Sequence, residues 1–257
     1  MNGNLQPHTQ PSKTHILLVS GGAIAAYVVT MTVLYALTHK VVFTLTFTNT
    51  ATATYVVIWR KRHTNSPLIA KSRKSWWRLL LNVLAAMVVT IGIYMGASTI
   101  ALLVKNVLNA PSPIQNVTDE VPLAAIAVLS ILIVPIGEEA LMRGFIYPVL
   151  RRKLSVASTI VITALLFAIL HGNLVQIVLT IPLGIALGYL YERTHNLLAC
   201  ISMHMLFNAT ALLLPSVHIG NLDAIAAALL VVITLGLWMC IPRIQAKRTA
   251  DTLMNEL

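Results

Sequence analysis

Long apolar runs, separated by short stretches rich in lysine and arginine, are the feature of this sequence that most limits how the chain can fold. A helix needs about 20 mostly apolar residues to cross a bilayer, and inside the hydrocarbon its backbone groups must all be paired. Only 10% of the residues are charged, whereas about a quarter are charged in a soluble domain. The sequence therefore predicts an all-α, polytopic transmembrane helix bundle of about eight spans, at 15–37, 41–59, 79–104, 121–150, 154–171, 174–191, 196–214 and 224–241.

The basic residues predict which side each connection faces. Of 18 Lys and Arg residues, Lys40 and Lys105 fall on one side, Arg143 falls within a span, and the remaining 15 fall on the side of the N-terminus. Such an excess marks the cytoplasmic side of a membrane protein, so both termini are predicted to be cytosolic. The net charge of +10 lies in these connections and not on one binding face. We therefore expect a lipid bilayer as partner and no nucleic acid.

The fourth predicted span carries three charged residues in the stretch Ile136-Gly-Glu-Glu-Ala-Leu-Met-Arg-Gly144. Each charge at the centre of a bilayer costs about 2.5–3.5 kcal/mol on insertion scales, so charges at this depth need partners or a function. Glu139 and Arg143 are four residues apart and can pair along one helix face. A purely structural ion pair explains these two residues but leaves Glu138, about 100° further round the helix, without a role.

Three further polar side chains lie in later apolar spans. His171 ends the fifth, and His204 and Asn208 share one face of the seventh because they are four residues apart. Alone, each has a plain structural explanation as an interfacial histidine or as a polar contact between helices. Together with a carboxylate they suit peptide hydrolysis. A carboxylate takes a proton from water, an imidazole shares that role or binds a metal, and N–H groups hold an oxyanion.

These motifs, in this order and on separate spans, resemble the CPBP family of CAAX prenyl proteases and bacteriocin-processing enzymes, also called the Abi family. The resemblance covers residues 121–214 and departs from the family where His195 replaces a glycine and Cys200 stands at a proline position. We accordingly divide the chain into a cytosolic segment (1–14), N-terminal spans (15–120), a catalytic core (121–214), and a last span with a cytosolic tail (215–257).

The resemblance implies an intramembrane endopeptidase of prokaryotic type in the plasma membrane. It implies that Glu138 activates water with the assistance of His171. It also implies that His204 and Asn208 form the oxyanion site, and that the ion pair of Glu139 and Arg143 braces the site. The family has also been described as metal-dependent, and in that case Glu138, His171 and His204 form a plausible zinc set. We expect no metal, because asparagine is a poor zinc ligand and no third histidine is placed to help.

The substrate implied is a peptide bond of a membrane-associated or lipidated protein. Two other functions remain open: a non-proteolytic bacteriocin-immunity protein on the same fold, and a proton-coupled transporter. Transporters often have two related halves. The first half of this chain contains no sequence similar to the Glu138 motif, which argues against a transporter. We expect Glu138, His171, His204 and Asn208 to line one cavity. A rise of about 1.5 Å per residue places His171 nearer the outer face than His204, so convergence requires helix tilt or a break near Pro135 and Gly137.

Overall fold

A computed structural model describes residues 12–63, 76–109, 121–213 and 225–237, with side chains of α3 described from residue 85 onward. Within these ranges the chain is helical and has no strand, which confirms the predicted all-α class. The predicted N-terminal segment, most of the 106–120 connection and the tail fall largely outside the described residues. The helices are α1 (Lys13–Thr38), α2 (Val41–His63), α3 (Trp76–Leu108), α5 (Leu123–Val128), η1 (Leu129–Ile133), α6 (Val134–Glu139), η2 (Ala140–Ile146), α7 (Tyr147–Arg151), α8 (Val156–Ile169), α9 (Leu174–Thr194), α10 (Leu197–Leu213) and a last helix at Ile225–Leu237.

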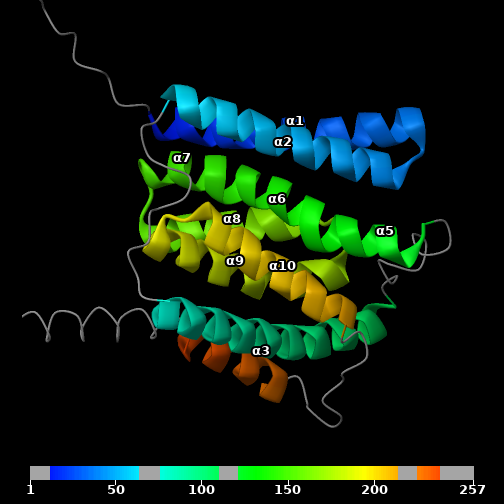
Figure 1. Ribbon diagram of the computed structural model, residues 1–257, viewed down its shortest axis with the longest axis vertical. Coiled ribbons are helices and arrows are strands. Elements are labelled where there is room, and N and C mark those ends of the chain that lie inside the picture. Colours follow the sequence, from blue (N-terminus) through cyan, green and yellow to red (C-terminus); the bar gives the residue numbers. More distant parts are fainter. Residues whose placement is uncertain (1–11, 64–75, 110–120, 214–224, 238–257) are drawn as a thin grey trace, which may run out of the picture.

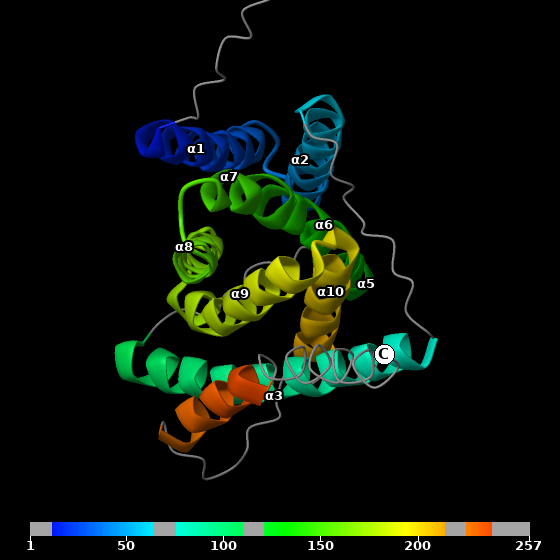
Figure 2. The same cartoon turned by 90° about the vertical axis from the view of Figure 1, so that its left-hand side faces the viewer.

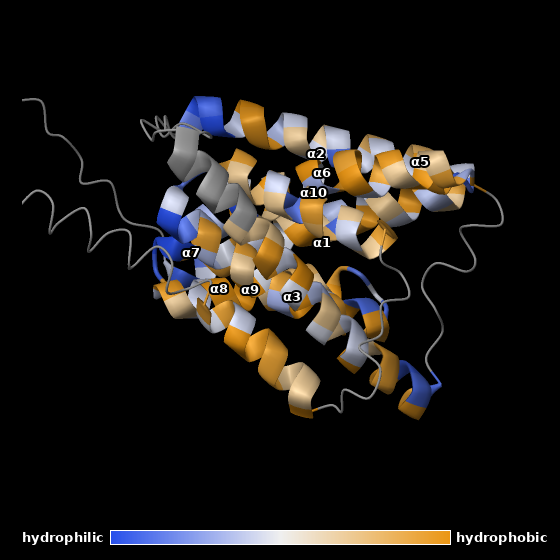
Figure 3. Cartoon of the chain, turned by 60° about the horizontal axis from the view of Figure 1, so that its bottom comes forward, coloured by the Kyte–Doolittle hydropathy of each residue, from blue (hydrophilic) through white to orange (hydrophobic). Residues whose placement is uncertain are grey.

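Each predicted span coincides with an apolar helix. Five stretches are long and apolar enough to cross a membrane: α1, α2, Ala85–Leu108 of α3, the continuous stretch Leu123–Arg151 and α9. Three shorter apolar helices, α8, α10 and Ile225–Leu237, account for the remaining predicted spans. Large apolar side chains face outward, with Leu18 69% and Val88 70% exposed. Hydrophilic residues gather toward the helix ends (Figure 3), so the outer surface suits a lipid environment.

The stretch Leu123–Arg151, here called the composite helix, lies inside the bundle. Figures 1 and 2 show α1 and α2 along one edge, α3 and the last helix along the opposite edge, and the composite helix with α8, α9 and α10 between them. In contacts, α2 packs on the composite helix, α8 on α9, and α9 on α3. The predicted catalytic core is thus covered on two sides by helices from the first half of the chain.

Two segments of the composite helix, η1 and η2, are π-helical, and they flank the short α6 segment that ends in Glu138 and Glu139. In the π register the donor to the Ser130 carbonyl would be residue 135, but Pro135 has no N–H. In the α register the donor to the Gly144 carbonyl would be Pro148, which also lacks one. Each proline thus removes one backbone donor from the composite helix, and side chains of α10 and α2 donate to the Ser130 and Gly144 carbonyls.

Helix ends and close crossings follow from individual residues. His39 and His195, which end α1 and α9, adopt left-handed conformations with φ of 51° and 46°. Glycine adopts this conformation most readily, which fits the glycine that the resemblance implies at the position of His195. At the crossing of α2 with α6, a Cβ on Gly137 would collide with Asn49. Only glycine lets the two helices approach this closely.

Candidate active site

The centre of the site is a buried group of three charged or ionisable side chains. Arg143 Nη1 donates to Glu139 Oε1 over 2.8 Å, so the predicted ion pair forms, and both side chains are 0% exposed. His204 on α10 places Nδ1 3.0 Å from the same Glu139 oxygen and is 2% exposed. Arg143 Nη2 also donates to the Gly184 carbonyl of α9 over 2.9 Å. The charge of Glu139 is thus compensated from its own helix and from α10.

Glu138 lies on the other side of the same imidazole. Its Oε2 is 3.7 Å from His204 Nε2, and its side chain is 16% exposed. Because Glu139 is paired with Arg143 and accepts hydrogen bonds, His204 Nδ1 must be the donor in the contact with Glu139. In the neutral ring Nε2 then carries a lone pair and faces Glu138.

The Glu138 carboxylate is not satisfied by the protein around it. Its Oε2 is buried and makes no hydrogen bond to any of the described residues. A buried carboxylate oxygen without a donor is unfavourable. Glu139 Oε2 is also buried without a donor among the described residues, but Glu139 Oε1 carries the ion pair with Arg143. Glu138 has no such pair and is available for chemistry.

Asn208 is anchored to the composite helix one turn beyond His204. Its Nδ2 donates to the Ser130 carbonyl over 2.7 Å, which is the carbonyl that Pro135 cannot serve. One hydrogen of the amide group is used in this contact, and the second stays free to serve a substrate. Asn208 therefore joins α10 to η1 and lies on the same face of α10 as His204.

His171 lies near the site without touching the glutamates. Its Nδ1 lies 3.0 Å from the Phe167 carbonyl, and the rings of Phe167 and His171 are 5.1 Å apart. The same Phe167 ring is 5.4 Å from the His204 ring and lies 5.5 Å from the Arg143 guanidinium carbon. His171 therefore approaches the His204 side of the site through Phe167, and among the described residues it makes no hydrogen bond to Glu138.

The alternative metal site was tested against these contacts. His204 lies between the two glutamates, whereas the contacts of His171 run to Phe167. Among the described residues, no three His, Cys, Asp or Glu side chains form a group that could hold a metal ion. The contacts of Glu138, His171 and His204 thus do not converge on one point, as the ligands of a three-ligand zinc site must.

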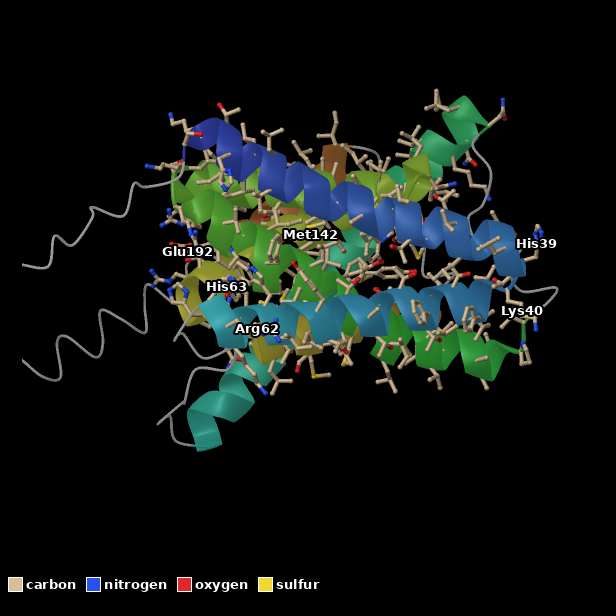
Figure 4. The ribbon with its side chains drawn as sticks, turned by 90° about the horizontal axis from the view of Figure 1, so that it is seen from above. His39, Lys40, Arg62, His63, Met142 and Glu192 are labelled. Atoms are coloured by element: carbon tan, nitrogen blue, oxygen red, sulfur yellow. The ribbon has the colours of Figure 1, made fainter. Side chains whose placement is uncertain are left out.

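Further contacts brace the end of the bundle that carries Arg62 and His63, opposite the end with His39 and Lys40 (Figure 4). Arg151 pairs with Glu192 at 3.0 Å, and Tyr147 donates to the same carboxylate over 2.9 Å. Arg60 of α2, 6% exposed, donates to the Gly144 carbonyl over 3.1 Å, the position that Pro148 cannot serve.

Sequence reasoning missed the contribution of α1 and α2 to the site. Tyr27 and Asn49 are 8% and 0% exposed, and Tyr27 donates to Asn49 Oδ1 over 3.2 Å. Asn49 packs against Gly137, next to Glu138. The motifs all lie beyond residue 121, so they carried no information about these helices. The signal that could have revealed them was the polar character of the second span, which includes Asn49.

Comparison with known proteins supports the motif reading. Residues 120–210 match the family model described as type II CAAX prenyl endopeptidase, Rce1-like, which confirms the resemblance to the CPBP family over this segment. A curated protein of Bacillus subtilis (strain 168), "Putative membrane peptidase YdiL", is 28% identical over 108 residues. The match covers 42% of this chain and 43% of that protein, so the chain spans less than half of the relative's length. No solved structure matches the chain.

Proposed function

We propose that this protein is an intramembrane endopeptidase in which Glu138 activates water. The observation that carries the proposal is the contrast between two adjacent carboxylates. Glu139 is 0% exposed and is paired through Oε1 with Arg143 and His204, whereas Glu138 is 16% exposed and its nearest basic atom is His204 Nε2 at 3.7 Å. One oxygen of each carboxylate, Oε2, has no hydrogen-bond donor among the described residues. Adjacent acids in different environments take different roles in catalysis. We assign Glu139 to the framework and Glu138 to the reaction.

In the proposed reaction, Glu138 takes a proton from water while the water oxygen bonds to the scissile carbonyl carbon. The electron pair of the C=O π bond moves to oxygen, and the free amide hydrogen of Asn208 lies on the helix face best placed to stabilise that oxyanion. The proton then passes from Glu138 to the leaving nitrogen as the C–N bond breaks. His204 Nε2, 3.7 Å from Glu138 Oε2, faces the carboxyl group and can accept a hydrogen bond from it once Glu138 has taken the proton. The predicted assisting role of His171 stays a prediction.

The substrate class follows from where the site lies. A scissile bond must reach a group of buried residues within a bundle of apolar helices. A chain held at the membrane by a lipid or an apolar segment reaches that depth at lower cost than a soluble peptide. The match of residues 120–210 to CAAX prenyl endopeptidases supports a lipidated or membrane-associated substrate. The excess of basic residues on one side supports a cytosolic location for both termini.

The test uses purified protein in liposomes with two internally quenched peptides. One peptide ends in a farnesylated CAAX sequence and the other has the same sequence without the lipid. Glu138→Gln removes the base at nearly constant volume, and we expect cleavage to fall about 10²–10⁴-fold. Glu192→Gln, at the inner end of the bundle, is the matched control that changes a carboxylate outside the site. Full activity of Glu138→Gln would refute the mechanism, and proton-coupled uptake without cleavage would favour a transporter.

A further inference from the structure

Two buried polar residues from the first half of the chain extend the site beyond its motifs. Tyr27 lies on α1 and Asn49 on α2, and the Tyr27 hydroxyl donates to Asn49 Oδ1 over 3.2 Å. The Asn49 Oδ1 atom that accepts this hydrogen bond lies against Gly137, the residue before Glu138. A tyrosine and an asparagine inside a lipid-facing bundle are costly unless they are paired. Their pairing beside Glu138 invites a functional explanation.

The position of Asn49 is fixed by its contact with Gly137. A Cβ on Gly137 would overlap the Cα, Cβ and Oδ1 atoms of Asn49, so the carboxamide packs directly against the backbone that precedes Glu138. Asn49 is 0% exposed. A shift of α2 along the composite helix would therefore move Asn49 relative to Glu138. Gly137 is the residue that lets Asn49 come this close to the composite helix.

The hydrogen bonds of Asn49 determine which way the Tyr27 hydroxyl points. Asn49 Nδ2 donates to the Leu45 carbonyl over 2.9 Å, and a carbonyl can only accept. The other carboxamide atom, Oδ1, must therefore be the acceptor for Tyr27. With its hydrogen committed to Asn49, the Tyr27 oxygen has only lone pairs to offer to a further group. It can accept from a neighbour but cannot donate to the Glu138 carboxylate.

We propose that Tyr27 is a further catalytic residue, which accepts a hydrogen bond from the nucleophilic water of Glu138, and that Asn49 is its positioning residue. This proposal rests on the proposed function. One hydrogen of the water points to Glu138 and the other to the Tyr27 oxygen, so an oxygen lone pair is directed at the scissile carbonyl carbon. During attack the first proton moves to Glu138. The second stays on the new C–O–H group and keeps its hydrogen bond to Tyr27.

The experiment measures kcat and KM separately with the farnesylated quenched peptide. Tyr27→Phe keeps the ring, and we expect kcat to fall roughly tenfold, the scale of one hydrogen bond, with KM within about twofold. Asn49→Leu frees the Tyr27 hydroxyl to turn its hydrogen toward Glu138, and we expect a similar loss. Because Asn49 acts through Tyr27, the double variant should be no slower than the slower single variant.

Tyr147→Phe is the matched control, because it also removes a hydroxyl that donates from a buried tyrosine. It should lower the melting temperature and leave kcat unchanged. If Tyr27→Phe melts too low to assay, Asn49→Leu provides the same measurement. Wild-type kcat in Tyr27→Phe or in a folded Asn49→Leu, beside an inactive Glu138→Gln, would overturn this proposal and leave the proposed function standing. A wild type that cleaves neither peptide would overturn both.

Discussion

Replacing Arg143 by methionine should destabilise the whole bundle. The guanidinium is 0% exposed, pairs with Glu139 at 2.8 Å and donates to the Gly184 carbonyl at 2.9 Å. Methionine fills much of the same volume, so the main loss is electrostatic: Glu139 is left buried without its cation. Breaking a buried pair from one side costs about 3–5 kcal/mol. At about 2–4 °C per kcal/mol, the melting temperature should fall by about 6–20 °C.

The assay is thermal unfolding in detergent for the wild type, Arg143→Met, and a double variant that also carries Glu139→Gln. The double variant removes the uncompensated carboxylate, because a neutral pair in place of a buried ion pair is often tolerated. It should therefore recover at least half of the lost stability, a non-additive result expected for residues in contact. Normal melting of Arg143→Met together with lost cleavage would refute this reasoning and give Arg143 a direct role with substrate.

Three other outcomes are expected. Reporter fusions after Lys153 should face the cytosol and fusions within 106–120 the opposite side, and a reversed pair of signals would invalidate the orientation drawn from basic residues. Chelators should leave cleavage unchanged, whereas elemental analysis that finds one zinc per chain, lost together with activity in His204→Ala, would replace the glutamate mechanism. With the native cysteines removed, single cysteines replacing Glu138 and His171 should both be protected by bound peptide from a membrane-impermeant thiol reagent. Protection of the first alone would remove His171 from the site.

The sequence predicted the parts of the structure that depend on local spacing. Apolar run lengths placed the helices, and the four-residue spacing of Glu139 and Arg143 predicted their pairing, observed at 2.8 Å. The same spacing placed His204 and Asn208 on one face, but it could not show that His204 contacts both glutamates or that Asn208 reaches Ser130. Those contacts depend on how separate helices cross.

Other features lay beyond any local pattern. The resemblance covered only 121–214, so it said nothing of Tyr27 and Asn49, although Asn49 packs on the residue before Glu138. Depths counted at a constant rise set His171 apart from His204, whereas one phenylalanine ring contacts both. A depth counted along each helix could not show which side chain lies between α8 and α10, because that depends on how the two helices pack.

The two prolines of the composite helix, Pro135 and Pro148, have a consequence for how the protein is assembled. In lipid an unpaired carbonyl is strongly unfavourable, and here the missing donors come from Arg60, made before the composite helix, and from Asn208, made after it. The glutamate-bearing helix therefore cannot hold its final shape by itself during synthesis. Because His204 and Asn208 both lie on α10, the site is complete only when α10 has packed on the composite helix.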